Sequence, residues 1–481
     1  MDKSRRSGME PVEYSGSQLG AARSGTRSKV ILPLLAALVA SACSLMPEPK
    51  PPSGPVAKDP GPRAGAPGAG DALAGLSAPE LEVFNVGKAD FAESEGATDG
   101  LGPRMNLDGC GGCHLYPSVG GSSPPVNPQI ALAKAMGATN EIPSFISANG
   151  PVREVRYVRN PDGTPDGGVQ ALFTIAGRSD APGCKLPQPN FKAELAKGNV
   201  IFRIPTPLFG SGLIEQIPDS EIWRNMRGDT AMKGEYGVKG RPNITLTSRT
   251  VSGQVNRNGN DGTFARFGWK AQNKSLLVFS GEAYNVEMGI TNELFQTERD
   301  ETPECQFATT PNDVTPLEAK SHIEGLSAIE KFAFFMRFLA APVPSKDQPG
   351  GADSISRGAK SFAVAGCALC HTPTLRTGNS RVAALRNQAV NLYSDLLLHN
   401  MGHGLADGIS QGQAGPSDFR TAPLWGLGQR LFFLHDGRTS DLRSAIQAHQ
   451  SWGSEANAVV DNYTRMSEPA KQDMLNFLRS L

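Results

Sequence analysis

The stretch NLDGCGGCHLYP, residues 106–117, and the stretch VAGCALCHTP, residues 364–373, each contain Cys-x-x-Cys-His. This pentapeptide is the attachment signature of c-type haem. Its two thiols can add to the two vinyl groups of one porphyrin, and the histidine can bind the iron. A zinc site would need a further ligand pair nearby, and a redox cysteine pair would need a β-α-β context. The motifs therefore predict two covalently bound haem c groups, held by Cys110, Cys113, His114, Cys367, Cys370 and His371.

The segments around the two motifs follow one plan. A glycine-containing helix with a phenylalanine, Phe91 or Phe362, precedes each motif, and each half closes on a further helix, AIEKFAFFMRFLAAP or KQDMLNFLRSL. Apolar residues three and four positions apart give the closing helices a buried face. The sequence therefore predicts a mainly α fold with two cytochrome c-like haem domains, residues 80–345 and 346–481.

The first of these domains is much longer than the second. Its extra length includes PVREVRYVRNPDGTPDGGVQALFTI, residues 151–175, where alternating apolar residues flank Pro-Asp-Gly. Alternation around such a turn indicates a β-hairpin. We expect a long insertion in the first domain that contains this hairpin.

Residues 1–42 have the pattern of a bacterial export signal. Basic residues in RSGTRSK (23–29) precede the apolar run VILPLLAALVA (30–40), which is too short to cross a bilayer and suits a signal peptide. Small residues before Cys43 resemble a lipobox, so we expect Cys43 to carry lipid; cleavage by ordinary signal peptidase is the alternative. The Pro-, Gly- and Ala-rich residues 43–79 then predict a tether. The expected location is the cell envelope, as a periplasm-facing lipoprotein of the outer membrane held only by its lipid.

The charge balance bears on the partner of the protein, and the cysteine count bears on its disulfides. Lys and Arg number 47 and Asp and Glu number 47, so the balance gives no support for a nucleic-acid partner. Seven cysteines are present. With Cys43 lipidated and four in the motifs, Cys184 and Cys305 are left, and an exported chain favours a disulfide between them.

Several longer segments resemble a known family. They include GLGPRMNLDGCGGCH, RIPTPLFGSGLIEQIPDSEI, RFGWKAQNKSLLVFSGEAYNVEMGITNELF, YSDLLLHNMGHGLADG and FRTAPLWGLGQRLFFLHDGRTSDLRSAIQAH. Together they are similar to the bacterial di-haem oxidoreductases described as putative peroxidases, also called thiol oxidoreductases, from about residue 81 to the C-terminus. A more remote likeness is to the di-haem cytochrome c peroxidases. The resemblance implies one haem that reacts with peroxide, another that relays electrons, and small redox proteins or quinol-linked donors as partners.

The resemblance also indicates a second axial ligand for the C-terminal haem. Related enzymes place this ligand fourteen residues after the histidine of HDG, which here is His449 after His435. In SDLRSAIQAH, with Ser440 expected to cap the helix, His449 shares an apolar face with Leu442 and Ile446. A hydrogen-bonded core histidine is the alternative reading. The segment LLLHNMGH offers His399, Met401 and His403 as other ligands.

The sequence also offers a candidate ligand and candidate acids for the N-terminal haem. Met288 is a candidate ligand, and Glu282 and Glu215 are candidates for the acid/base that peroxide cleavage requires. The related peroxidases have a Glu and a Gln before their VEM segment, where this chain reads SLLVFSGEAY. Trp269, between the two motifs in sequence, is a candidate to carry electrons between the haems.

Three classes of function remain open on these grounds. The first is an enzyme, a di-haem oxidoreductase of peroxidase type. The second is an electron-transfer cytochrome with two six-coordinate irons, and the third is a surface haem protein in metal acquisition. A five-coordinate, high-spin haem would favour the enzyme, whereas two low-spin haems would favour the carrier.

The small residues before Cys43 generate a test of the anchor. Cells that express the protein should incorporate labelled palmitate into the wild type and not into Cys43→Ala, because the thiol is the expected acceptor of the lipid. Gel autoradiography of the purified proteins measures this. Equal labelling of the two proteins would contradict the anchor.

Overall fold

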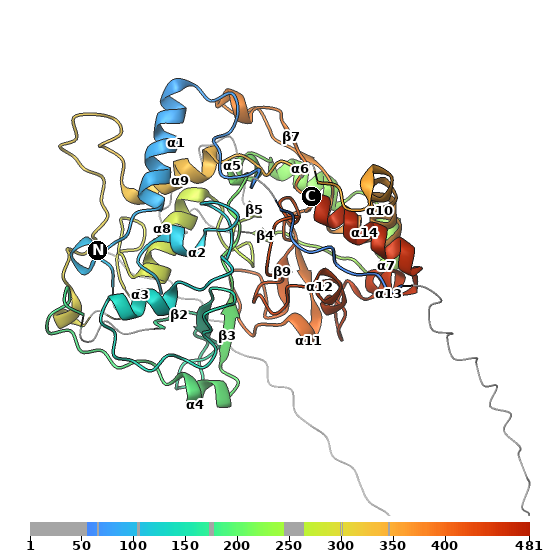
Figure 1. The fold of residues 1–481 in the computed structure, drawn as a ribbon. Coiled ribbons are helices and arrows are strands. Elements are labelled where there is room, and N and C mark those ends of the chain that lie inside the picture. Colours follow the sequence, from blue (N-terminus) through green and yellow to red (C-terminus); the bar gives the residue numbers. More distant parts are fainter. Residues whose placement is uncertain are drawn as a thin grey trace, which may run out of the picture. The chain divides into compact units, whose positions relative to one another are not determined.

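The helices that begin and end each half of the chain pack in pairs. In a computed structural model, α1 (Ala78–Phe91) lies along α9 (Ala328–Phe338), and α10 (Gly351–Ala365) lies along α14 (Glu468–Ser480) (Figure 1). The structure describes residues 55–64, 67–102, 106–172, 178–244, 264–298, 300, 302–344 and 347–481. All of them belong to one compact unit, residues 52–481. The expected signal peptide and Cys43 lie outside the described residues.

A glycine lies at each of the two helix crossings. A methyl group on Gly87 would lie 2.3 Å from the carbonyl oxygen of Lys331 in α9. One on Gly358 would lie 2.0 Å from the carbonyl oxygen of Asp473 in α14. No larger side chain fits at these distances, so glycine is what lets each pair of helix backbones approach this closely.

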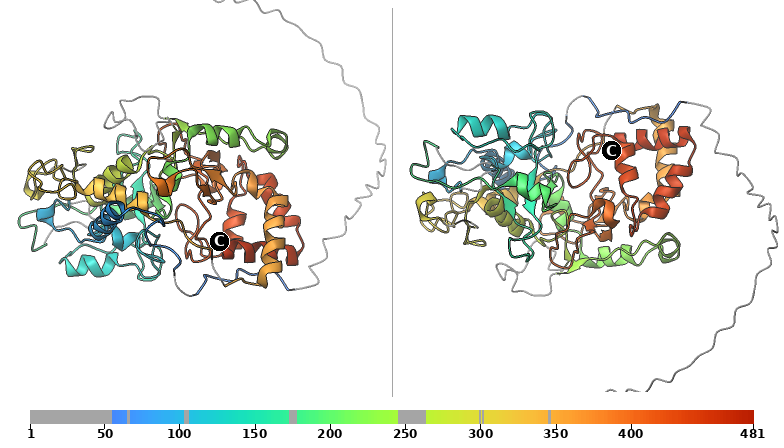
Figure 2. Two further views of the ribbon diagram at one scale, coloured as in Figure 1. Left: turned by 90° about the horizontal axis from the view of Figure 1, so that it is seen from above. Right: turned by 90° about the horizontal axis from the view of Figure 1, so that it is seen from below.

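The close approach brings a phenylalanine of the first helix of each pair against one of the closing helix. The ring centroids of Phe91 and Phe335 are 5.0 Å apart, and those of Phe362 and Phe477 are 5.5 Å apart. Phe91 and Phe335 belong to one hydrophobic core, and Phe362 and Phe477 to a second. Figure 2 shows the orange and red helices of the second half gathered together, apart from the blue and yellow helices of the first. Phe91 and Phe362 are both buried, so each packs inside the core of its own half.

The two cores do not divide at the expected domain boundary. The first core also buries apolar residues from 375–397 and Trp425, which belong to the second half of the chain. Burial therefore crosses the predicted boundary between residues 345 and 346.

The predicted hairpin is confirmed, and it has a third strand. β1 (Glu154–Tyr157) pairs antiparallel with β2 (Val169–Gln170), with Val155 opposite Gln170. On its other edge β1 pairs antiparallel with β3 (Val200–Arg203). The remaining strands form two-stranded pairs: β4 (Asn243–Ile244) with β5 (Phe264–Ala265), β6 (Leu375–Arg376) with β7 (Ala389–Val390), and β8 (Leu398–Asn400) with β9 (Asp418–Arg420).

Short helices join these elements. The α-helices are α2 (Cys110–Cys113), α3 (Gln129–Ala135), α4 (Phe191–Ala196), α5 (Ser211–Glu215), α6 (Asp219–Met226), α7 (Thr230–Tyr236), α8 (Leu276–Met288), α11 (Gly402–Leu405), α12 (Leu442–Ala448) and α13 (Asn457–Arg465). The 3-10 helices are η1 (Ala97–Asp99), η2 (Pro303–Cys305), η3 (Cys367–Leu369) and η4 (Ala383–Leu385). Within the described ranges, none of the helices has the length and apolar character needed to cross a membrane.

The predicted tether is wrong for the described part of residues 55–79. Ala57 is buried in the second core and donates its N–H to Glu468 (2.7 Å), while Ala69 is buried in the first core. Between them, Asp59 accepts two hydrogen bonds of 2.8 Å from Arg479 of α14. The Arg479 side chain is 1% exposed, so it needs a buried countercharge, and Asp59 supplies it. Composition alone could not reveal this partner.

The two cysteines outside the motifs are joined. Cys184 and Cys305 form a disulfide, and both are buried in the first core. This is the pairing that the cysteine count favoured. It ties residue 184, which follows the hairpin, to the segment that precedes α9.

The helix crossing at Gly358 generates a test of the packing. Gly358→Ala should lower the free energy of unfolding by about 2 kcal/mol, because the methyl group must push α10 away from the α14 backbone. Urea unfolding followed by circular dichroism measures the change. The control is Gly234→Ala in α7, where nothing lies within 4 Å of an added methyl group, and no loss is expected there. Equal losses in the two variants would contradict the close contact.

Candidate functional site

The histidine of each motif lies against the phenylalanine of its helix pair. The ring centroids of His114 and Phe91 are 5.9 Å apart, and those of His371 and Phe362 are 6.3 Å apart. His114 Nδ1 lies 3.0 Å from the carbonyl oxygen of Gly121, and His371 Nδ1 lies 3.0 Å from that of Tyr393. Because a carbonyl only accepts, each Nδ1 donates, and the lone pair of the neutral ring is on Nε2.

Burial also keeps both imidazoles neutral. It lowers the pKa of His114 and of His371 to about 4, so neither ring carries a charge near pH 7. A neutral imidazole with Nδ1 bonded and Nε2 available is the form that binds a metal. Both histidines border cavities that also contain the cysteines of their own motifs. The residues present therefore fit a haem at each motif.

The cavity beside His371 is mostly apolar. Its walls include Phe362, Leu405, Leu424, Ile446 and Val459. His449, at the end of α12, borders the same cavity, and its Nδ1 donates to the carbonyl oxygen of Ala445 (2.7 Å). Its Nε2 is thus available in the same way as that of His371, and burial lowers its pKa. The structure places these two histidines at one cavity, as the proposed ligand pair requires.

The expected cap of this helix is wrong by one residue. Asp441, not Ser440, caps α12, because its carboxylate accepts the N–H of Ser444 at 2.8 Å. The change leaves His449 where the helix pattern placed it.

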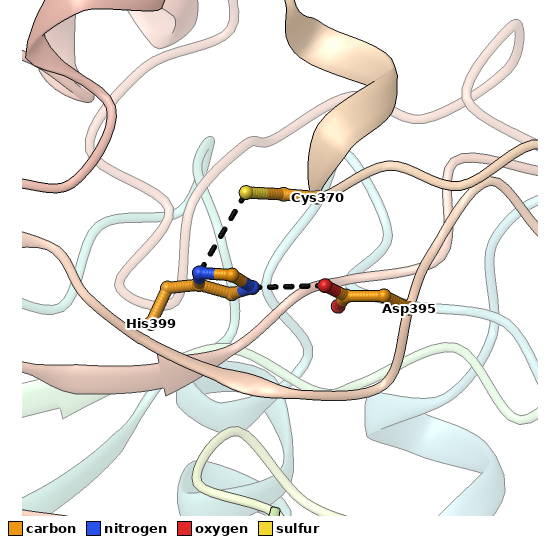
Figure 3. Close-up of side chains that lie close together, drawn as sticks. All are labelled: Cys370, Asp395 and His399. Atoms are coloured by element: carbon orange, nitrogen blue, oxygen red, sulfur yellow. Dashed lines mark hydrogen bonds and ion pairs between the residues drawn. The ribbon is translucent and has the colours of Figure 1, made fainter. Parts of the chain in front are cut away.

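The alternative ligands in LLLHNMGH are less suitable. His399 Nε2 lies 2.9 Å from an oxygen of Asp395, and its Nδ1 lies 2.8 Å from one of Glu455. Figure 3 shows His399 between Asp395 and the sulfur of Cys370, and these three residues could hold a metal by geometry. Cys370 belongs to a haem motif, however, and both nitrogens of His399 are already engaged. His403 is exposed and stacks on Trp452, which leaves Met401 as the alternative that borders the cavity.

The cavity beside His114 differs because one side of it is polar. Glu154 and Arg156 from β1, Arg203 from β3 and Glu287 from α8 all border it. Arg156 and Glu154 form an ion pair with N–O distances of 2.7 and 3.3 Å. Gln272 also borders the cavity, and its buried Oε1 has no hydrogen-bond partner among the described residues. These acid, guanidinium and amide groups favour a polar reactant at this site.

Glu287 is the acid of this cavity. Burial raises its pKa to about 8, and Glu154 adds to the rise while Arg156 opposes it. The side chain is therefore mostly protonated near pH 7. A protonated carboxyl in an enclosed cavity can give a proton to a reactant there.

The acids chosen from the sequence lie elsewhere. Glu215 is fully buried, pairs with Arg337 (2.9 Å) and accepts the N–H of Leu276 (3.0 Å), so it holds α5, α8 and α9 together. Glu282 bonds Asn273 and does not border the cavity. Met288 does border it, with its sulfur 3.9 Å from the sulfur of Cys110. Met288 thus lies beside a cysteine of the first motif, at the cavity that His114 also borders.

Sequence reasoning missed Glu154, Arg156 and Arg203. The first two are separated by one residue in the hairpin strand, so they lie on one face of it. The sequence did show two charged residues on one face of a strand in the predicted hairpin. It did not show that this face borders the cavity of the first motif.

Trp269 separates the two cavities. It borders both of them, and its indole N–H donates to the carbonyl oxygen of Ile204 at 2.9 Å. Its ring also lies edge-on to His435, with centroids 6.4 Å apart. The residue is therefore fixed between the two haem sites.

Comparison with known protein families identifies the family of the chain. The family described as "Di-haem oxidoreductase, putative peroxidase" matches residues 153–481, more than half of the chain. The chain belongs to this family. The match begins after the first motif, so Cys110, Cys113 and His114 lie outside it.

Other comparisons add little. No curated protein matches the chain. A solved structure, "Kuenenia stuttgartiensis Hydrazine Synthase Pressurized with 20 bar Xenon", is similar at 17% identity over 34% of this chain and 56% of that chain. The chain thus spans just over half the length of that protein. The TM-score is 0.22, which is too low to support a shared fold.

The paired histidines generate a test of ligation. His449→Met should raise the midpoint potential of the C-terminal haem, because a thioether ligand favours ferrous iron more than imidazole does. His449→Ala should leave that iron high-spin and open to cyanide. Redox titration and optical spectra measure both changes, with exposed His403→Ala as a control that alters neither. Unchanged spectra and potentials in His449→Ala would refute the ligand and make Met401 the next candidate.

Proposed function

We propose that the protein is an exported, lipid-anchored c-type di-haem oxidoreductase that reduces peroxide at the N-terminal site and relays electrons through the C-terminal site. The observation that carries this proposal is the difference between the two cavities. The cavity beside His114 is bordered by Glu287, whose raised pKa keeps a proton on its carboxyl, whereas Glu455, which borders the cavity beside His371, is held ionised by His399 at 2.8 Å.

The two Cys-x-x-Cys-His motifs would hold two covalent haem c groups. Cys110 and Cys113 would attach the first and His114 would ligate it; Cys367 and Cys370 would attach the second and His371 and His449 would ligate it. A bound haem supplies one-electron redox chemistry, and the polarity and donors of its distal pocket decide whether it activates a small molecule.

Glu287 would serve as the acid/base at the N-terminal site. Reduction of hydrogen peroxide to two waters takes up two electrons and two protons, and the oxygen that leaves must be protonated. The raised pKa of about 8 keeps a proton on the Glu287 carboxyl at neutral pH. Arg156, held by Glu154, keeps a positive charge beside it and can orient a polar reactant.

The C-terminal site would feed electrons to the N-terminal site. Two imidazole ligands would leave no open position on its iron, and most of the cavity wall is apolar. Trp269 borders both cavities and is the proposed path between them. The expected donors are small redox proteins or quinol-linked carriers in the periplasm, with the anchor at Cys43 holding the protein at the outer membrane.

The proposed role of Glu287 can be tested by one isosteric change. Glu287→Gln keeps the shape of the side chain and removes its transferable proton, so the second-order rate constant for peroxide reduction should fall by about 10²- to 10⁴-fold. Stopped-flow spectroscopy measures the rate, and the haem content should stay the same. Exposed Glu235→Gln on α7 is the matched control and should react like the wild type. If the wild type shows no reaction with peroxide, the protein is better described as an electron-transfer cytochrome.

A further inference from the structure

Two arginines border the otherwise apolar cavity at His371. Arg420 is the last residue of β9, and Arg430 follows in the loop that leads to His435. Arg420 is only 9% exposed. Both arginines also border a smaller cavity that includes Trp269, next to the N-terminal site.

Neither guanidinium has a countercharge among the residues that the structure describes. Arg420 donates its Nε–H to the carbonyl oxygen of Gly268 (3.0 Å). Across the described ranges, no hydrogen bond from the Arg430 side chain is found, and no carboxylate forms an ion pair with either arginine. Other deeply buried arginines are paired: Arg203 with Asp407, Arg266 with Asp219, Arg337 with Glu215 and Arg479 with Asp59. Arg420 and Arg430 depart from this rule.

This arrangement is costly for the protein alone. Burial lowers the pKa of both arginines to about 10, and the charge of Arg430 contributes to the lowering at Arg420. Both nevertheless stay protonated near pH 7, so two positive charges lie at a largely apolar cavity. Arg420 is buried and Arg430 is half-buried, and a charge withdrawn from water without a partner is unfavourable. The cost would be offset by an anionic ligand.

We propose that Arg420 and Arg430 bind the two carboxylate groups of the C-terminal haem. This rests on the haem placement in the proposed function. A haem is an apolar disc with two propionate groups, and the cavity offers mostly apolar walls and two cations. The guanidinium fork suits carboxylates because it can donate two parallel hydrogen bonds. The two guanidinium groups could also bind a small free anion such as acetate or phosphate. The experiment therefore has one arm for the haem carboxylates and one for a free anion.

The first arm changes the arginines in the haem-loaded protein. Arg420→Met and Arg430→Met should keep two haems by intact mass. The propionate bending band in the resonance Raman spectrum should shift, and the midpoint potential of the C-terminal haem should fall, because positive charge near a haem favours the added electron. Arg430→Lys keeps the charge and should restore most of the potential. The control is Arg465→Met, an exposed position on α13, which should change neither quantity.

The second arm adds acetate or phosphate to the wild type. No saturable spectral change is expected, since the haem carboxylates already occupy the arginines. A saturable change that Arg430→Met abolishes would assign the arginines to a free anion and overturn the proposal. Unchanged Raman bands and potentials in both methionine variants, with two haems attached, would also overturn it while leaving the proposed function intact. A wild type without a haem at Cys367 and Cys370 would overturn both.

Discussion

The close contact of two helix backbones is what the rest of the structure depends on. At Gly87 and at Gly358 a carbonyl oxygen of the closing helix occupies the space of a missing side chain. That approach sets a phenylalanine, four residues further along the first helix, against a phenylalanine of the closing helix. The same phenylalanine lies beside the motif histidine. The same helix packing, used twice, therefore orients the two motif histidines.

The two sites differ in the elements that surround the paired helices. At the first site, β1 of the hairpin brings Glu154 and Arg156 to the cavity, β3 brings Arg203, and α8 adds Glu287. At the second site, α12 brings a second histidine to a mostly apolar cavity. Its border, in the part of the chain that the structure describes, also includes Arg420, Arg430 and Glu455, which lies 2.8 Å from His399 Nδ1. The inserted strands at the first site and the histidine of α12 at the second therefore make the two cavities different, although the helix pairs are alike.

Much of this could be predicted from the sequence because the signals are local. The motifs, the helices with Phe91 and Phe362, the Pro-Asp-Gly hairpin and the helical face of His449 each lie within one short segment. What failed needed long-range contacts. Asp59 meets Arg479 across the length of the chain, so a proline-rich segment looked like a free tether. The sequence does not show that Glu215 pairs with Arg337, 122 residues away. It also does not show the burial that raises the pKa of Glu287.

We propose that one chain holds two haems in unlike sites, one open and one ligated by His371 and His449. The electron paramagnetic resonance spectrum of the purified ferric protein, with spin quantitation, is the measurement that decides this. We expect two haem spins for each chain, one high-spin and one low-spin with the signature of two imidazole ligands, and a loss of the high-spin signal when peroxide is added. A single haem, or two low-spin signals that peroxide does not change, would contradict it.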